Sequence, residues 1–532
     1  MGVLDKTYNT LINKTLLFLI SISVFSKLLL VRGGFLTEPD ERLYFWSFSF
    51  IKRLSLGHIG SALESLFSAR GRPVEVLLKS IPATLQIISA KIFGLNVFET
   101  KNMWIIFGFN MIIFIAILFF IYKIALLVFK NKSLALITTL FYSLLINSFV
   151  YLRHIYPYDT SLLLTVLLLY YIIKLYISNE KISQKKAFSF GFLAFLSFMF
   201  YPTFYLMFYV LFFVFVWVLW NGFRDKKYLL SRAIAYISGS VFLLVLTELT
   251  ARAVNKSYIL NLLHLSGTID QGDYNESVYF LFKYLINVEY FTGILIIIGL
   301  LLFIVRLPKL IKTENKVKLL MAYLFVFSTL MYLLHTGILC YWTHKMTVYI
   351  RQMHQFMPVL VLFAMMGFNE FYKSFKNDYP FSIKTYKLLI FSILVIVLIV
   401  FQMKDYLRIS YPRDVYWTYL RHTKKDLIKE ISEYDDSWSN LPTRFIDKEK
   451  ITNTKDTIIA VNTQYFFPVK DFLKYHPYKN TRKKLIFSAP HFLNYKAYQY
   501  EGYTSKEREN INKMKLFIRI YKILSIKSDK SK

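Results

Sequence analysis

Long apolar runs separated by short polar segments dominate this chain. A helix that crosses a lipid bilayer needs roughly 20 mostly apolar residues. Stretches near that length lie at 15–31, 76–97, 103–129, 133–152, 158–178, 187–201, 203–222, 232–252, 288–306, 317–339, 355–372 and 385–404. Because neighbouring runs can merge or split, the pattern predicts a mostly α-helical, polytopic membrane protein with about 11–13 transmembrane helices. The run at 76–97 is the weakest, since it contains Lys79, Gln86 and Lys91, and polar groups inside a span usually face a cavity or a partner.

Three segments are too polar to span. Residues 32–75 include "DERLYFWSFSFIKRL", where apolar and aromatic residues at helical spacing predict amphipathic helices lying along the membrane interface. Residues 253–287 are polar and mixed. The tail from 405 to 532 combines a helical pattern, "VYWTYLRHTKKDLIKEISEY", with three strand-like stretches, "DTIIAVN", "KKLIFSA" and "KLFIRIYKIL". We therefore expect a transmembrane domain at 1–404 and a small, soluble C-terminal α/β domain at 405–532.

Composition supports membrane insertion, since 55% of the residues are hydrophobic and only 18% are charged. A soluble protein this apolar could not cover its surface with polar groups. The chain has one cysteine, Cys340, so no internal disulfide can form. The fold must therefore depend on packing within the lipid.

The net charge of +32 arises from 65 Lys and Arg against 33 Asp and Glu. Nucleic-acid binding would need a basic soluble domain, and most of this chain is apolar. Loop cations that face anionic headgroups or a phosphorylated lipid substrate explain the excess better. Lys6 and Lys14 favour a cytoplasmic N-terminus, which would place 32–75 outside. The side of the tail then depends on whether the number of spans is even or odd.

The stretch "TEPDE" places three carboxylates, Glu38, Asp40 and Glu41, within four positions after the first apolar run. A helix start explains the residue types, because Pro39 suits the first helical position and acids suit the first turn. Three neighbouring carboxylates also repel one another, which raises the pKa of at least one of them. A carboxylate with a raised pKa is suited to act as a general base. Both interpretations stay open at this stage.

Three basic stretches accompany it. In "YLRHIYPYDTSLLL", Arg153, Tyr158 and Asp159 lie between two apolar runs, where they fit either a site or interfacial anchoring and helix capping. In "CYWTHKMTVYIRQMHQF", Arg351 and His354 are three residues apart, so one helical face can present both to a phosphate. An interfacial basic collar is the alternative.

The third basic stretch is "SARGRPVEVLLKSIP". Arg72 precedes Pro73 and is expected at the membrane interface, whereas Lys79 and Pro82 lie inside the weakest apolar run. A cation and a proline at that depth indicate the wall of a cavity.

Four of these stretches occur in an order that resembles the GT-C superfamily of polytopic glycosyltransferases, which includes protein O-mannosyltransferases and the aminoarabinose transferase of lipid A. "EPDE" is similar to the acidic motif of their first extracytoplasmic loop, and "KSIPATLQIISAKIFG" to a Lys-Pro-Pro-Leu-like helix start. "LRHIYPYDTSLLL" and "RQMHQFMPVLVLFAMMG" are similar to two later elements. Two departures are that Glu38 stands where the family often has His, and that "KSIP" lacks the double proline.

The resemblance implies transfer of a hexose or pentose from a polyprenyl- or dolichyl-phosphate donor to a hydroxyl of a glycan, lipid or protein on the extracytoplasmic side, with inversion. Asp40 would be the general base and Glu41 a second catalytic carboxylate. The lipid phosphate would be bound by Arg72, Lys79, Arg153, Arg351 and His354. Glu38, Tyr158 and Asp159 would support them. A divalent cation, Mg²⁺ or Mn²⁺, would suit the carboxylates, but no ligand set is evident.

Other classes remain open. A ligase or polymerase of lipid-linked polysaccharide would place its catalytic residues in a large late loop. A transporter or flippase for a phosphorylated lipid would share the basic cavity and often shows inverted repeats, none of which is visible. A structural membrane protein is the simplest alternative. In each case we expect an integral multi-pass protein, of the inner membrane in a bacterium or the endoplasmic reticulum in a eukaryote.

Overall fold

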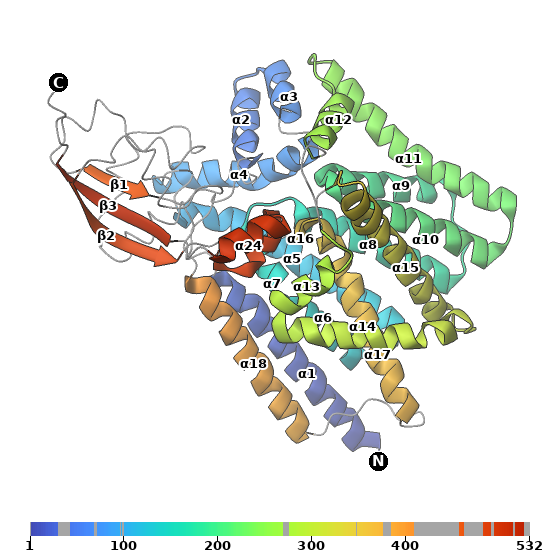
Figure 1. Cartoon of the computed structure of the whole chain (residues 1–532). Helices are drawn as coiled ribbons and strands as arrows, with labels where there is room; N and C mark the ends of the chain where they lie inside the picture. Colours follow the sequence, from blue (N-terminus) through green and yellow to red (C-terminus); the bar gives the residue numbers. More distant parts are fainter. Residues whose placement is uncertain are drawn as a thin grey trace.

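The computed structural model describes residues 2–29, 43–68, 72–95, 97, 100–269, 276–346, 348–375, 385–408, 457–461, 482–490, 494–513 and 517–525. Most of these residues are helical (Figure 1). The first elements are α1 (Gly2–Ser26), α2 (Leu43–Ser55), α3 (Ile59–Phe67), α4 (Pro73–Phe93), α5 (Thr100–Phe129), α6 (Lys132–Ser143), α7 (Ile146–Arg153), α8 (Tyr158–Ser178), α9 (Gln184–Phe200), the 3₁₀ turn η3 (Pro202–Phe204), α10 (Tyr205–Phe223) and α11 (Lys226–Arg252). They are followed by α12 (Tyr258–Ile269), α13 (Phe280–Asn287), α14 (Tyr290–Ile311), α15 (Lys316–Leu333), the π-helix η4 (Leu334–Trp342), α16 (Ile350–Met353), the 3₁₀ turn η5 (His354–Phe356), α17 (Met357–Phe375) and α18 (Thr385–Arg408). The last elements are β1 (Thr457–Val461), β2 (Arg482–Pro490), α23 (Lys496–Gly502), α24 (Ser505–Lys513) and β3 (Phe517–Ser525).

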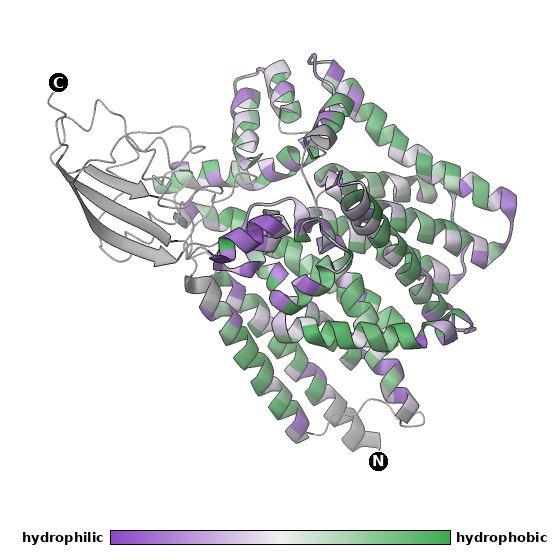
Figure 2. Cartoon of the chain, in the orientation of Figure 1, coloured by the Kyte–Doolittle hydropathy of each residue, from purple (hydrophilic) through white to green (hydrophobic). Residues whose placement is uncertain are grey.

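The prediction of a mostly helical, multi-pass membrane protein is confirmed. Each of the apolar runs named above contains a helix. Among the described residues, nine helical segments are long and apolar enough to cross a membrane, and α6 with α7, bent by 60°, makes a tenth if the pair is one span. α9 has 17 residues and packs against its neighbours like the others. Figure 2 shows these helices as largely hydrophobic, in contrast to the polar helix α24.

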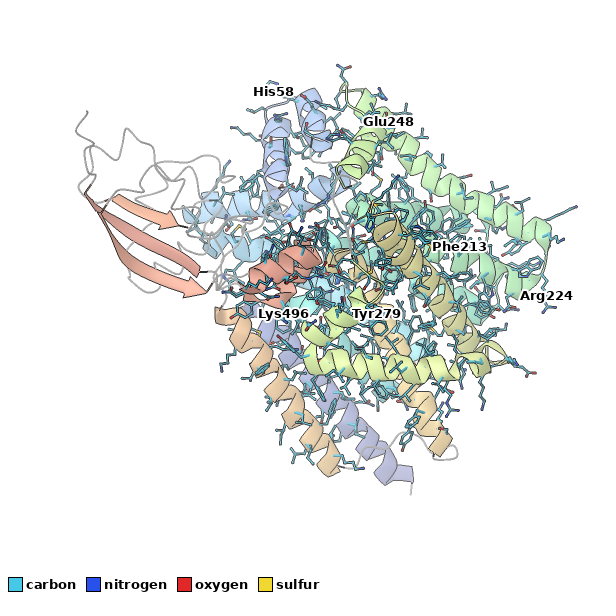
Figure 3. The ribbon with its side chains drawn as sticks, viewed as in Figure 1. His58, Phe213, Arg224, Glu248, Tyr279 and Lys496 are labelled. Carbon is cyan, nitrogen blue, oxygen red and sulfur yellow. The ribbon has the colours of Figure 1, made fainter. Side chains whose placement is uncertain are left out.

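Hydrogen bonds between helix ends define two ends of the bundle. The "Asn179 end" is where α8 ends, and the bonds there are Lys316 Nζ to Asn179 Oδ1 (3.1 Å), Lys318 Nζ to Glu370 Oε2 (2.7 Å) and Arg306 Nη2 to Ser374 Oγ (2.8 Å). The "Tyr201 end" is where α9 meets η3, and the bonds there include Met207 N to Gln355 Oε1 (2.9 Å) and Tyr205 to His335 Nδ1 (2.5 Å). In Figure 3, Arg224 before α11 and Glu248 near its end mark these opposite ends.

The first and last membrane helices share this arrangement. α1 begins beside α6, where Ser133 Oγ donates to Asn13 Oδ1 (3.0 Å). α6 and α18 both finish at the Tyr201 end, where Gln402 Nε2 donates to the Leu144 carbonyl oxygen (2.8 Å). α18 therefore ends at the end of the bundle opposite to the start of α1.

Helix α4 lies along the Tyr201 end, although its length and hydropathy suit a span. Near its start, Lys79 Nζ donates to the Ile155 carbonyl oxygen (2.9 Å), and farther along, Asn102 Nδ2 at the start of α5 donates to the Gln86 carbonyl oxygen (2.9 Å). One face of α4 buries Glu75, Lys79 and Gln86. The opposite face exposes Leu77, Ile81, Leu85, Ile88 and Ile92. Such a helix places its polar stripe on the protein and its apolar stripe toward lipid.

The predicted interfacial helices of the first loop correspond to α2 and α3, which have 13 and 9 residues and are too short to span. They pack on each other and on α4. Ser47 Oγ of α2 donates to the Val76 carbonyl oxygen of α4 (3.0 Å). The first loop therefore covers the Tyr201 end of the bundle.

All three predicted strands of the tail are present, and they form an antiparallel sheet in the order β1–β3–β2. The helix predicted around 416–435 lies outside the described residues. Between β2 and β3 in the sequence, the chain leaves the sheet to form α23 and α24, which lie on the membrane helices (Figure 1). The predicted domain boundary at 404 falls near the end of α18, but part of the predicted soluble domain packs on the bundle.

Candidate functional site

Two of the predicted arginines converge on Tyr201. Arg72 immediately precedes α4, and its Cζ lies 5.1 Å from the centre of the Tyr201 ring. Arg351 belongs to α16 and is half-buried. Burial raises the pKa of the Tyr201 hydroxyl, while the positive charges of Arg351 and Arg72 act to lower it. Both guanidinium groups are therefore close enough to Tyr201 to act on it electrostatically.

Tyrosine rings form the interior beside these arginines. The Tyr158 ring centre lies 4.4 Å from that of Tyr201, 4.7 Å from that of Tyr156 and 4.9 Å from that of Tyr151. Tyr156 and Tyr158 are stacked, whereas Tyr151 meets Tyr158 edge-on. Aromatic pairs at these separations add stability beyond their buried area and restrain each ring. The predicted supporting residue Tyr158 is thus the centre of the cluster.

The predicted residues His354 and Asp159 are bonded to each other. His354 Nε2 lies 2.8 Å from Asp159 Oδ1, and His354 Nδ1 lies 2.8 Å from Asn147 Nδ2. Because an amide nitrogen can only donate, Nδ1 is the acceptor, and Nε2 carries the proton that is donated to Asp159. Both ring nitrogens are occupied, so this arrangement favours a positioning role for His354 over the direct phosphate contact that we expected. Asp159 Oδ2 is buried and has no hydrogen-bond partner among the described residues.

Glu289 holds α7, the helix that carries Asn147. Its carboxylate accepts bonds from the backbone N–H groups of Ile146 (2.6 Å) and Asn147 (3.0 Å), and from the Tyr284 hydroxyl (2.6 Å). A carboxylate is favourable at a helix N-terminus because that end carries partial positive charge. Burial nevertheless raises the pKa of Glu289 to about 6, and Lys27, which is also buried, acts to lower it.

Lys79 is buried and paired. Its ammonium lies 2.5 Å from Glu75 Oε1 and donates to the Ile155 carbonyl oxygen, so it ties α4 to the connection between α7 and α8. Glu75 Oε2 also lies 4.0 Å from Arg72 Nη1. This pairing favours a structural role for Lys79, while Arg72 stays at the edge of the tyrosine cluster.

Glu501 contacts the tyrosine cluster, although nothing in the sequence singled it out. It lies on α23, and the Tyr151 hydroxyl donates to Glu501 Oε2 (2.6 Å). Its charge also acts on Tyr201, in the direction opposite to the arginines. Nothing in "KAYQYEG" distinguishes this acid, because it contacts a residue 350 positions earlier in the chain.

Three predicted residues and the side chain of a fourth lie outside the part of the chain that the structure describes. Glu38, Asp40 and Glu41 lie outside the described residues, and Arg153 ends α7 while its side chain lies outside them as well. Within the described ranges, no group of three or more His, Cys, Asp or Glu residues could hold a metal ion. The expectation of a divalent cation stays a prediction.

No family model matches the chain, and no curated protein matches it. One solved structure with some similarity is the crystal structure of the Archaeoglobus fulgidus oligosaccharyltransferase tethered with an acceptor peptide. That match has 11% sequence identity and a TM-score of 0.38, and it covers 73% of this chain and 55% of the other. A likeness this low does not by itself establish a shared fold or function.

Proposed function

We propose that the chain is a membrane glycosyltransferase that moves a sugar from a polyprenyl- or dolichyl-phosphate to an acceptor hydroxyl at the Tyr201 end. The observation that carries the proposal is the Arg72 guanidinium over the Tyr201 ring, with the positive charge of Arg351 acting on the same tyrosine. These arginines come from opposite halves of the sequence, yet the charges of both act on the same tyrosine at the Tyr201 end.

The chemistry of the leaving group explains why two arginines are useful there. When the bond between sugar and phosphate breaks, negative charge grows on the lipid phosphate, and fixed cations stabilise it. Guanidinium groups bind phosphate through two parallel N–H donors, which also fixes its orientation. Arg153 ends α7, two residues after Tyr151, and is the third candidate. Asp159 and His354 would hold the tyrosine cluster in place.

The acceptor hydroxyl needs a base, and Asp40 is our candidate, with Glu41 as the second catalytic carboxylate and Glu38 beside them. The described chain resumes at Leu43, which packs in one cluster with Val76 and Met199. Val76 lies in the first turn of α4, and Met199 precedes Tyr201 by two residues.

The charge of the loops supports an extracytoplasmic position for the Tyr201 end. Connections at the Asn179 end carry Lys130 and Lys132, then Lys181, Lys185 and Lys186, then Arg224, Lys226 and Lys227, then Lys309, Lys312 and Lys316. The connections at the Tyr201 end carry fewer: none from α9 to η3, Arg153 at the edge of that from α7 to α8, Lys256 from α11 to α12 and Lys345 from η4 to α16. Because short cytoplasmic loops are rich in Lys and Arg, the Asn179 end faces the cytoplasm in this proposal.

The test uses the purified chain in lipid nanodiscs with a panel of short-chain polyprenyl-phosphate sugars. Release of polyprenyl phosphate is measured with candidate acceptors, and binding of polyprenyl phosphate is measured alone, with unphosphorylated polyprenol as the control ligand. Arg351→Ala and Arg72→Ala should each weaken phosphate binding by about tenfold or more, the size of one lost charge-assisted contact. Lys345→Ala, which removes an exposed cation near Arg351, is the matched control.

The variant Asp40→Asn separates the transfer reaction from the binding of polyprenyl phosphate. It should abolish release of polyprenyl phosphate while leaving its binding intact. If the wild type instead moves the phosphorylated lipid across a vesicle membrane and never cleaves it, the chain is a transporter and the proposal is wrong.

A further inference from the structure

We propose that Glu501, on the C-terminal helix α23, is a positioning residue of the same site, so that the tail completes the site and is more than an appended domain. The inference rests on the proposed function for its readout. It identifies a residue outside the predicted transmembrane domain and outside every motif singled out in the sequence.

Burial and contact place α23 inside the membrane domain. Tyr498 and Glu501 are 2% and 6% exposed. α23 packs against α7 and α16, the helices that carry Tyr151 and Arg351. The Tyr498 ring meets the His154 ring edge-on, with centres 5.7 Å apart. A soluble domain that only rested on the bundle would not bury a carboxylate among these side chains.

Two further contacts tie the hairpin of α23 and α24 to the bundle, and a third stabilises the hairpin itself. Arg508 of α24 forms a buried ion pair with Glu276, and its Nη1 donates to the Tyr503 carbonyl oxygen (2.7 Å). Asn287 Nδ2 of α13 donates to the Tyr500 hydroxyl (3.0 Å). Buried ion pairs of this kind fix one arrangement, because a displaced partner leaves an uncompensated charge. The position of α23 is therefore specific.

Glu501 can act on the site in two ways. Through its bond to the Tyr151 hydroxyl it fixes a ring that packs on His354, with centres 4.4 Å apart, and on Tyr158. Its negative charge also opposes the fields of Arg72 and Arg351 at Tyr201. In the absence of lipid phosphate, this charge partly balances two cations in a region of low dielectric.

These two actions predict opposite effects on binding and turnover. Glu501→Gln removes the opposing charge, so polyprenyl phosphate should bind about three- to tenfold more tightly. It also weakens the hold on Tyr151, so turnover should fall about tenfold or more. Tyr151→Phe removes the hydroxyl alone and should lower turnover without the gain in affinity. A variant that is merely misfolded would lose both.

The experiment measures Kd for polyprenyl phosphate and kcat for its release with the full-length chain in nanodiscs. Glu509→Gln, on the exposed face of the same hairpin where Glu509 pairs with Lys513 (2.7 Å), is the matched control and should change neither. Glu501→Asp, which keeps the charge, should retain the wild-type Kd.

The outcomes separate the two proposals. If the wild type binds polyprenyl phosphate but Glu501→Gln and Tyr151→Phe both behave like the control, the inference about Glu501 is overturned. If the wild type does not bind polyprenyl phosphate and Arg351→Ala changes nothing, the proposed function itself fails. Tighter binding with slower turnover in Glu501→Gln supports both.

Discussion

Replacing Gly191 by alanine should separate two helices that touch through their backbones. A Cβ atom at Gly191 in α9 would lie 1.7 Å from the carbonyl oxygen of Tyr236 in α11. A Cβ at Gly239 would lie 2.1 Å from the Phe188 carbonyl oxygen, so the contact is reciprocal. Backbone atoms cannot rotate away as a side chain can. The helices must move apart by about 1.5 Å or more to restore ordinary contact.

The cost has two parts. Overpacking a close-packed contact costs about 1–3 kcal/mol. Ser240 Oγ donates to the Gly191 carbonyl oxygen (2.9 Å) across the same contact, and the loss of that buried hydrogen bond adds about 1 kcal/mol. We therefore expect Gly191→Ala to lower the free energy of unfolding by about 2–4 kcal/mol. Once the helices are apart, Gly239→Ala should cost much less than it does alone.

The single cysteine provides the assay. Cys340 is buried, so a thiol-reactive fluorescent dye labels it only when the protein unfolds, and the midpoint temperature of labelling reports stability. Gly108→Ala is the matched control, because it lies in α5 and a Cβ there would meet nothing within 4 Å. That variant should be neutral or slightly stabilised, since alanine favours helices over glycine. If Gly191→Ala labels at the same temperature as Gly108→Ala, the close contact between α9 and α11 is wrong.

Three other predictions follow from buried polar groups. Asp159→Asn weakens the charge-assisted bond to His354, so kcat for release of polyprenyl phosphate should fall about tenfold; an unchanged rate would exclude the positioning role. In the folded protein, burial raises the pKa of Glu289 to about 6, above its ordinary value. The protonated carboxyl therefore stabilises the fold at low pH, and this contribution to the free energy of unfolding falls by about 2 kcal/mol as pH rises through 6. Glu289→Gln should remove that dependence in the cysteine-labelling assay, and a persistent slope would assign it to another group. Arg508→Leu leaves Glu276 buried and unpaired, which should speed hydrogen exchange across 496–513, whereas exchange at the wild-type rate would show that the pair does not anchor the hairpin.

The hydrophobic pattern predicted the helices well. Each span must satisfy its own backbone hydrogen bonds in lipid, so a continuous apolar run in the sequence is enough to identify it. The three strands of the tail were also predictable, because each shows its alternation of apolar and polar residues within a few positions. The position of α4 was not predictable in this way, because a window average records that 76–97 is apolar but not that Lys79 and Gln86 share one face.

The candidate site also combines features that are visible in the local sequence with features that only tertiary packing decides. Arg72, Arg351, Tyr158, Asp159 and His354 were recognisable because charge and aromatic residues next to an apolar run are conspicuous. Their pairing was not, since the bond from His354 to Asp159 joins residues 195 positions apart and is decided by tertiary packing. That bond favours a supporting role for His354 over the phosphate contact predicted from the sequence.

The hairpin of α23 and α24 also sets an order of events during biosynthesis. Its residues follow every membrane helix in the chain, yet Glu501 and Tyr498 fill space between helices made hundreds of residues earlier. While the nascent chain still lacks them, Tyr151 has no bond to Glu501, and the His154 ring has no contact with Tyr498. A premature stop codon after 495 would consequently yield a fully inserted protein with an unfinished site.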